Sequence, residues 1–332
     1  IDPAIAAMPK QSSALSGLLI VDKPGLPFDW HTAGRDLNEY DLPTSHDVVQ
    51  QVRRASRQRR IGHTGTLDPM ASGVLVLCLG QATRLVEYYQ GHPKQYLAEI
   101  TLGTATDTYD ALGEVTERCP VPPLTAAMID DALAGFRGEI DQRPPIYSAL
   151  KQGGESLHRK ARRGETVEIE ARRITIHDLT LVDWIEPNRL RVQVRGSAGT
   201  YVRSLAHDLG VALGTCGHLS GLRREAAGPF TLADAHTLDT ITAAGQALDE
   251  VLLPPGWGLT LPELMLDGTA MQRLGFGQKV WLHDGAIALV AGSLARAVDE
   301  QGTFAGIVRC LEAGTDAAPG GLWKAEKWFA NG

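Results

Sequence analysis

Residues 62–80, GHTGTLDPMASGVLVLCLG, place one carboxylate, Asp68, among small and hydroxyl-bearing residues directly before an apolar run. Pro69 fixes the turn after Asp68, and residues 74–77 predict a strand buried on both faces, a rigid mount for a reactive group. The loop has no second acid for general acid–base chemistry and no Cys or His at metal-ligand spacing. Asp68 is therefore a candidate nucleophile that acts alone, or else an Asp that caps a turn before proline.

This segment resembles the catalytic motif of the pseudouridine synthases, in particular the bacterial TruB-type tRNA pseudouridine-55 synthases, GHTGTLDPxAxGxLxxxxGxAT, and the match continues through residues 81–83. Six further segments resemble the family's motifs in the same order, over about residues 17 to 230. They are GLLIVDKPG at 17–25, KQY at 94–96, TDTYDALG at 106–113, PIYSALK at 145–151, GTYVR at 199–203 and LSGLRR at 219–224. The order and number of these segments make a chance resemblance untenable.

The resemblance implies an α/β fold of the α+β type: the pseudouridine synthase fold, with a mixed, largely antiparallel central sheet flanked by helices. The short strand-like runs of residues 258–332 resemble a small β-rich PUA-type RNA-binding domain. The implied activity is isomerisation of uridine 55 in the tRNA T-loop, which breaks the N1–C1′ bond and rejoins the base through C5. This reaction needs no cofactor and no metal, but the nucleotide must be flipped out at a cost of roughly a few kcal/mol.

The resemblance also implies the site. Asp68 attacks C6 of the base or C1′ of the sugar, or abstracts a proton to give a glycal. Burial against residues 74–77 tends to raise the pKa of a carboxyl group, so a cation is needed beside Asp68. The family resemblance makes Arg203 that cation. The other implied residues contact or stack on the nucleotide, or shape the pocket floor: His63, Tyr96, Tyr201 and Leu222, with Lys23 and Pro24 in support.

Each of these residues also has a plainer interpretation. His63 is also explained as a turn histidine bonded to backbone, and Arg203 as a surface arginine at a helix start. Tyr96 and Leu222 are also explained as core residues. Tyr201 is implied to accept or relay the C5 proton, which is the less secure part of its role.

The net charge of −7 is unusual for an RNA-binding protein, since phosphate contact favours basic surfaces. Two local basic runs answer this objection, although each is also explained as a solvated helix face. We predict RNA phosphate contacts from Arg53, Arg54, Arg57, Arg59 and Arg60, and from Arg159, Lys160, Arg162 and Arg163.

Hydrophobic spacing predicts the elements that position these residues. A helix with Val48, Val49 and Val52 on one face follows a cap at Thr44 or Ser45, and a second helix runs from a Thr125 cap to Gly138. In that second helix we expect one face lined by Met128, Ile129, Ala132, Leu133 and Phe136. Alternation predicts strands at 97–102 and 190–195, a helix is expected from Tyr201, and short strands are expected at 279–282 and 286–291.

These elements divide the chain. Residues 1–14 are expected to be disordered, with Met8 as the natural start and 1–7 as added residues. The catalytic domain is expected at 15–253, with an RNA-contacting segment at 145–170, then a linker at 254–256 and the PUA-like domain at 258–332. Relative to the family pattern, residues 28–43 are an insertion. We favour an inert surface excursion, with an RNA-contacting flap or a partner site as alternatives.

Four scattered cysteines, Cys78, Cys119, Cys216 and Cys310, form no C-x-x-C pair and predict free structural thiols in a reduced, cytoplasmic protein. No apolar run approaches the roughly 18 residues of a membrane span, and the first residues lack the features of a secretory signal. We expect a monomer that binds the T-arm of tRNA without an obligatory protein partner. The rival functions are an RNA chaperone that uses the same surface and a guide-RNA-dependent pseudouridine synthase subunit.

Overall fold

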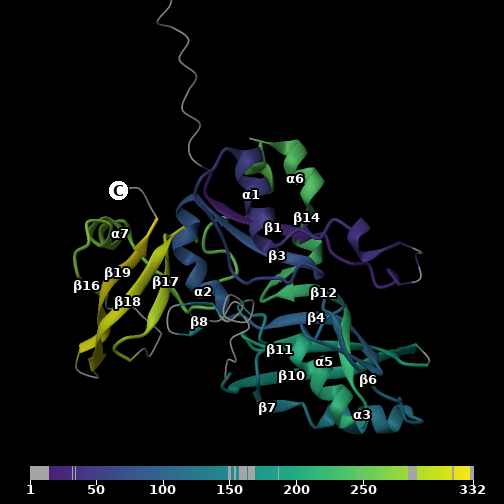
Figure 1. The fold of residues 1–332 in the computed structure, drawn as a ribbon. Helices are drawn as coiled ribbons and strands as arrows, with labels where there is room; N and C mark the ends of the chain where they lie inside the picture. The colour runs from purple at the N-terminus through teal and green to yellow at the C-terminus, as the bar shows by residue number, and fades with distance from the viewer. Residues whose placement is uncertain are drawn as a thin grey trace, which may run out of the picture.

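The structure, a computed structural model, describes residues 15–31, 33, 35–148, 151, 152, 155, 156, 163, 169–185, 187–245, 247–282, 290–315 and 318–329. A mixed ten-stranded sheet takes up the larger part, and a separate five-stranded sheet follows it in the chain (Figure 1). The predicted α+β fold with a mixed, largely antiparallel sheet and a β-rich C-terminal region is therefore confirmed.

The large sheet has the central order β14-β1-β3-β12-β4-β11-β10-β7, with β2 paired to β3 and β13 paired to β12. The β1–β14 and β3–β12 pairs are parallel, and the other pairs are antiparallel. The strands are β1 (Gly17–Lys23), β2 (Ile61–His63), β3 (Ser72–Leu79), β4 (Lys94–Leu102), β7 (Gly138–Gln142), β10 (Arg172–Ile185), β11 (Arg189–Gly196), β12 (Gly217–Ala227), β13 (Phe230–Thr231) and β14 (His236–Thr237).

Helices cover this sheet. The helix α1 (Ser45–Ser56) begins at a Thr44 capping box and buries Val48, Val49 and Val52, as predicted. It lies beside α6 (Leu238–Ala244), and α5 (Val202–Ala212) packs against β12 (Figure 1). The remaining short elements are α2 (Val86–Gln90), β5 (Thr104–Thr106), β6 (Val115–Arg118), β8 (Lys151–Gln152), β9 (Glu155–Ser156) and 3₁₀ turns at Leu37–Glu39, Gly80–Leu85, Leu232–Asp234 and Leu248–Val251.

The helix predicted from Thr125 to Gly138 is shorter than expected. It is α3 (Ala126–Ala134), with the Thr125 cap as predicted and Ile129 and Leu133 buried. Met128 is 47% exposed, so its predicted place on the buried face is wrong. Gly138 does not end the helix but opens β7 with a φ of 87°, because the chain needs three further residues to turn back toward the sheet.

The C-terminal sheet has the order β15-β17-β18-β19-β16, and α7 (Gly268–Gly275) packs on β16 and β19. Its strands are β15 (Glu263–Met265), β16 (Val280–Leu282), β17 (Leu294–Val298), β18 (Phe304–Thr315) and β19 (Ala318–Trp328). One apolar cluster joins the two sheets, since it contains Leu18, Phe230 and Ile307. Residues 254–256 form a turn between them, with the Trp257 amide donating to the Pro254 carbonyl at 3.2 Å.

The first part of the insertion at 28–43 is seated on the sheet through Phe28, Trp30 and His31, whereas most of its described residues from 33 to 41 are exposed. Trp30 donates from Nε1 to the Ser220 carbonyl on β12 at 2.9 Å. Phe28 covers Gly221, where an added Cβ would lie 2.6 Å from the ring. His31 bonds Arg189 and lies 4.0 Å from the fully buried carboxylate of Glu99. Whether the insertion is inert in function stays a prediction.

Two of the four cysteines are not free thiols, which corrects the prediction. Cys119 and Cys216 form a disulfide across 97 residues of sequence, whereas Cys78 and Cys310 are free and buried. Gly103 brings the pair together: its amide donates to the Cys216 carbonyl at 2.7 Å, and its carbonyl accepts from the Cys119 amide at 3.0 Å. This contact between segments distant in sequence has no local sequence signal.

Some predictions fall outside the described residues. These are the N-terminal segment 1–14, most of the 145–170 segment with Arg159, Lys160 and Arg162, and residues 286–289 of one expected strand. Arg163 is described and lies in an exposed turn. No helix within the described ranges is long and apolar enough to cross a membrane.

Candidate active site

The loop that carries Asp68 is held by side chains from three other elements. Lys23, at the end of β1, donates to the carbonyls of Pro69 at 2.9 Å and Ala71 at 2.8 Å. Ser45, at the start of α1, both donates to the Leu67 carbonyl and accepts from the Leu67 amide. An Asp68 that only caps a turn, the alternative interpretation from the sequence, does not explain why side chains distant in sequence bond to this loop.

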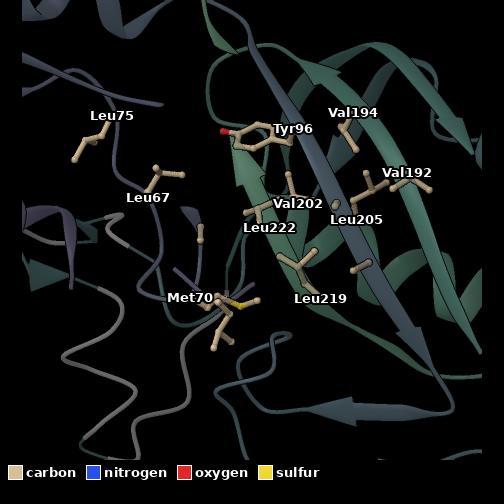
Figure 2. Packing of buried hydrophobic residues seen from close by; sticks show 14 of the residues in the cluster. Leu67, Met70, Leu75, Tyr96, Val192, Val194, Val202, Leu205, Leu219 and Leu222 are labelled. Carbon is tan, nitrogen blue, oxygen red and sulfur yellow. The ribbon is translucent and has the colours of Figure 1, made fainter. Parts of the chain in front are cut away.

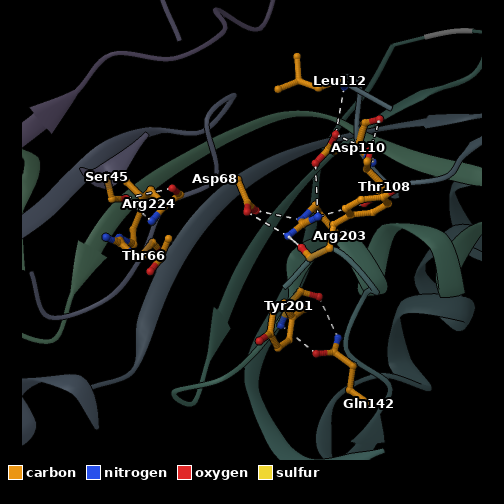
Figure 3. A network of polar contacts seen from close by, with 12 residues as sticks. Ser45, Thr66, Asp68, Thr108, Asp110, Leu112, Gln142, Tyr201, Arg203 and Arg224 are labelled. Atoms are coloured by element: carbon orange, nitrogen blue, oxygen red, sulfur yellow. Dashed lines mark hydrogen bonds and ion pairs between the residues drawn. The ribbon is translucent and has the colours of Figure 1, made fainter. Parts of the chain in front are cut away.

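A third anchor, Arg224 on β12, is buried and donates to three carbonyls on both sides of the loop. The acceptors are Gly65 at 3.1 Å, Thr66 at 3.3 Å and Val74 at 2.6 Å. Hydrogen bonds from charged donors are stronger than neutral ones, so the backbone around Asp68 is held firmly. Figure 3 shows Ser45, Thr66 and Arg224 on one side of Asp68.

Asp68 faces the guanidinium group of Arg203, on the first turn of α5. Arg203 Nε and Nη2 each lie 3.0 Å from a different Asp68 oxygen, which is a two-bond pairing (Figure 3). The Arg203 side chain is 7% exposed and that of Asp68 is 29% exposed. Arg203 is therefore not a surface arginine, and one acid remains open to a ligand.

The same guanidinium serves a second carboxylate, Asp110, which lies 3.6 Å from Arg203 Nη1. Arg203 also donates to the carbonyls of Thr108 at 3.1 Å and Tyr147 at 2.9 Å. Burial raises the pKa of Asp110, against the opposing effect of Arg203. The carboxylates of Asp68 and Asp110 thus share the Arg203 guanidinium group. Each of its three nitrogens has a carboxylate or carbonyl acceptor, so its orientation is well defined.

A cavity of about 510 Å³ opens beside Asp68. Tyr96, Tyr201, Arg203 and Leu222 line it together with Asp68, as the sequence predicted for the nucleotide pocket. Tyr96 on β4 and Leu222 on β12 also pack against the core, so the plainer interpretation of both as core residues holds as well (Figure 2). The size, the aromatic rings and the single open carboxylate suit a flat polar ring such as a nucleobase.

Tyr201 is placed by its backbone at the start of α5. Gln142 donates from Nε2 to the Tyr201 carbonyl at 2.9 Å and accepts from the Tyr201 amide at 2.8 Å (Figure 3). Burial raises the pKa of the Tyr201 phenol, so the phenol keeps its proton at neutral pH. A protonated phenol is a poor base, but it can pass a proton on.

Three predicted site residues do not line this cavity. His63 lies on β2, where burial and then Arg224 lower its pKa. Lys23 is fully buried beneath the loop, and both Lys23 and Pro24 line a separate cavity of about 520 Å³. Neither residue lines the Asp68 cavity, although the Asp68 carboxylate is near enough to raise the pKa of Lys23 against the larger lowering by burial. Lys23 supports the loop through its bonds to Pro69 and Ala71, and the pocket-floor role of Lys23 and Pro24 stays a prediction.

The first basic run forms an arginine cluster at the C-terminal end of α1. Arg53, Arg54, Arg57 and Arg59 surround one open hollow together with Gln58. Arg53 also donates to the Ile61 carbonyl at 3.0 Å, and Arg60 lies apart, with Nη2 3.4 Å from the Thr83 hydroxyl. Cationic side chains that gather around a hollow suit a phosphate group.

Several residues that complete the site were not predicted as site residues from the sequence. Asp110 and Thr108 lie in TDTYDALG, Tyr147 and Ser148 in PIYSALK, and Arg224 in LSGLRR, so motif membership was an available signal. Ser45 was expected only as a possible helix cap and Gln142 carried no signal, because their contacts with the site arise only from packing. In the described ranges, no group of three or more His, Cys, Asp or Glu side chains could hold a metal ion.

Solved structures share this fold. One chain of a Cbf5–Nop10–Gar1 complex superposes with a TM-score of 0.71 at 24% identity, covering 95% of this chain and 85% of that one. A chain from an H/ACA RNP bound to a substrate RNA containing 2′-deoxyuridine gives a TM-score of 0.70 at 23% identity, with the same coverage. At this identity the likeness concerns the fold alone.

Sequence relatives are much nearer. The tRNA pseudouridine synthase B of Symbiobacterium thermophilum is 49% identical over 70% of this chain and 77% of the relative. That of Chromohalobacter salexigens is 40% identical over 93% of this chain and 95% of the relative. Residues 53–202 match the model for the TruB family pseudouridylate synthase N-terminal domain, and residues 203–259 match the tRNA pseudouridylate synthase B C-terminal domain. This chain belongs to the TruB family of pseudouridylate synthases.

Proposed function

We propose that this chain converts uridine 55 in the T-loop of tRNA to pseudouridine, with Asp68 as the nucleophile. As a family member it is a tRNA pseudouridine synthase, an isomerase. The position in the tRNA and the residue roles are our proposal. The observation that supports them best is Asp68 itself, open to a cavity of about 510 Å³ and paired in two places with Arg203.

Residues that line the cavity can be assigned to each step of the isomerisation. A flipped uridine stacks on the Tyr96 ring, which is worth roughly 1–3 kcal/mol and offsets part of the cost of flipping. Arg203 holds the Asp68 carboxylate in one orientation toward the nucleotide. Asp68 then attacks C6 or C1′, or removes a proton to give a glycal. All three routes use the same carboxylate and need no redox partner.

Tyr201 completes the reaction as a proton relay. Its raised pKa keeps the phenol protonated, so it cannot take the C5 proton without giving up its own. Ser148 lies near enough to the Tyr201 phenol to lower its pKa against the effect of burial, and it lines the same cavity, so its hydroxyl is our candidate for the next proton carrier. Leu222 closes the apolar side of the pocket, and His63, outside the cavity, contacts the opened T-loop.

The RNA backbone binds the arginine cluster on α1. The twelve-residue α1 separates this cluster from Ser45, which touches the Asp68 loop. The contacted phosphates are therefore several nucleotides away from the flipped uridine. The predicted contacts from Arg159, Lys160, Arg162 and Arg163, and RNA binding by the PUA-like sheet at 258–332, extend this surface. We further propose a cytoplasmic monomer without an obligatory protein partner.

The decisive experiment uses unmodified tRNA transcript labelled with tritium at C5 of uridine. The wild-type chain is expected to release tritium without guide RNA, with pseudouridine mapped at position 55. Asp68→Asn should abolish release while tRNA affinity changes less than about threefold, because a neutral amide of the same shape keeps the contacts but is no nucleophile. Asp131→Asn, an exposed acid on α3, is the matched control and should behave as wild type.

Other outcomes identify the rivals. Tritium release by Asp68→Asn at the wild-type rate would remove Asp68 from the chemistry. Accelerated tRNA folding without any release by the wild type would indicate the RNA chaperone. Release that requires an added guide RNA would indicate the guide-dependent subunit.

The arginine cluster has its own test. Replacing Arg54 and Arg59 together by Gln should weaken tRNA binding and lower the slope of log affinity against log salt by about one for each lost phosphate contact. The exposed Arg118 on β6 supplies the control, Arg118→Gln. An unchanged salt slope in the double variant would place the RNA elsewhere.

A further inference from the structure

Tyr109 has a backbone conformation that is unusual for its residue type. Its φ is 62°, and in the described part of the chain only Arg57 among the other non-glycine residues has a positive φ. For a bulky side chain this left-handed region carries strain, which persists only where surrounding contacts hold it. Tyr109 does not line the Asp68 cavity, so contact with a ligand there does not explain this strain.

The conformation of Tyr109 aims both of its neighbours at Arg203. The Thr108 carbonyl accepts from Arg203 Nη1 at 3.1 Å, and the Asp110 carboxylate lies 3.6 Å from the same nitrogen. Within the turn, the Thr106 hydroxyl donates to the Asp110 carbonyl at 2.8 Å. A relaxed backbone at Tyr109 would turn at least one of these two acceptors away from the guanidinium.

The ring of Tyr109 fastens this turn to α5. It stacks on His207 with the ring centroids 4.1 Å apart and the planes 10° apart. His207 follows Arg203 by four residues on α5, so both side chains lie on one face of the helix. The turn at 108–110 is thus joined to α5 at two points one helical turn apart, the Arg203 guanidinium and the His207 ring.

Other features around the Tyr109–His207 stack help to keep the two rings together. The stacked pair lines a cavity of about 360 Å³ together with Arg143 and Asp208. Burial raises the pKa of the Tyr109 phenol, so the ring stays neutral. The Tyr109 carbonyl accepts from the Leu219 amide at 3.0 Å, which ties the turn to β12, the strand that carries Leu222.

We propose that the Tyr109–His207 stack is a positioning device for the isomerisation: it keeps the strained turn closed, so that Thr108 and Asp110 hold Arg203 in register with Asp68. The proposal rests on the proposed function of Asp68 and Arg203. Without the stack, the turn relaxes and Arg203 samples orientations in which it no longer pairs with both Asp68 oxygens. Substrate binding, which depends on the cavity walls and the arginine cluster, is retained.

The test replaces each ring separately and both together. Tyr109→Leu keeps a bulky residue that is strained in the left-handed region but has no ring, His207→Gln keeps polarity but has no ring, and Tyr109→Phe keeps the stack. For the first two we expect kcat to fall about tenfold, the order of one lost aromatic pair, with KM within about twofold. Tyr109→Phe should retain most of the wild-type kcat.

The double variant separates positioning from general damage. If the two rings act only through each other, Tyr109→Leu with His207→Gln should lose no more kcat than the worse single variant. Val211→Ala, at a 60% exposed position on α5, is the control for changes to this helix. Thermal unfolding of each variant shows that the measured kcat belongs to folded enzyme.

Three outcomes would overturn the proposal. These are an unchanged kcat in Tyr109→Leu, losses of kcat that add in the double variant, or a Tyr109→Phe variant as slow as Tyr109→Leu. These failures differ from failure of the proposed function, in which the wild-type chain itself makes no pseudouridine at position 55.

Discussion

Two clusters of acids and arginines lie on opposite faces of the central sheet. The front cluster contains Asp68, Asp110 and Arg203, and the back cluster contains Glu99, Arg189, Arg191 and His31. Tyr96 lines the front cavity and Glu99 lies three residues later on β4, so their side chains point to opposite faces. The two clusters differ in the ratio of carboxylates to guanidinium groups and in the access of solvent to the carboxylates.

In the front cluster two carboxylates share one guanidinium, and Asp68 keeps 29% of its side chain exposed. In the back cluster two guanidiniums share one carboxylate, and Glu99 is fully buried under the insertion. Arg191 Nε lies 3.0 Å from Glu99 and Arg189 Nη1 lies 3.6 Å from it. A carboxylate with surplus partners and no access cannot react, whereas one that competes for a partner beside a cavity can.

The largest effect is expected from Arg203→Lys at the front. An ammonium group cannot make the two aligned bonds to Asp68 or reach the remaining acceptors, so kcat should fall about a hundredfold. Single-turnover tritium release measures this loss. Arg195→Lys, at an exposed position on β11, is the control, and equal losses in the two variants would deny Arg203 a special role.

The next effect is expected from Glu99→Gln at the back. The change leaves Arg189 and Arg191 without a counter-charge and should lower the free energy of unfolding by about 2 kcal/mol, less than a fully buried pair because both arginines keep some water contact. Urea unfolding measures it, with the exposed Glu117→Gln as control. A large loss of kcat in folded Glu99→Gln would contradict the division of roles between the clusters.

The two faces should also respond to opposite pH extremes. At the front, burial lowers the pKa of Lys23 from 10.5 to about 8. As the pH rises through this value, Lys23 loses one N–H that holds the Asp68 loop, so kcat should fall. Stability should not fall with it: between pH 8 and 10.5 the unfolded chain binds the proton more tightly, so the free energy of unfolding rises through this group.

At the back, burial and then Arg189 lower the pKa of His31 below 6.5. The folded state therefore resists protonation of His31, and its contribution to stability is lost as the pH falls below 6.5. Unfolding of wild type and His31→Gln between pH 5 and pH 7 measures this term. Parallel curves for the two proteins would exclude His31 as the titrating group.

The smallest effect is expected from Trp30→Phe in the insertion. Phenylalanine keeps most of the packing but cannot donate to the Ser220 carbonyl, so the free energy of unfolding should fall by about 1 kcal/mol, with kcat unchanged. Chemical unfolding and tritium release together test this. A drop in kcat would mean that the insertion also shapes the Leu222 side of the pocket through β12.

Much of the front cluster could be predicted, because its residues lie in sequence motifs that closely resemble those of a known family. Asp68, Arg203, Tyr96, Tyr201 and Leu222 all reach one cavity as expected. His63, Lys23 and Pro24 do not, since a motif indicates that a residue matters but not which side of a loop its side chain takes. The back cluster was not predicted, because Glu99 looks like an exposed residue of an alternating strand.

The sequence by itself determined the local elements: the Thr44 and Thr125 caps, the buried strand after Asp68, the strand at 190–195 and the helix after Tyr201. These depend on interactions between residues a few positions apart. Only the tertiary structure decided the Cys119–Cys216 disulfide, the seating of the insertion over Glu99, and the Tyr109–His207 stack. Each of these joins segments that the strand order of the sheet brings together, and strand order is set by packing of the whole core rather than by any local pattern.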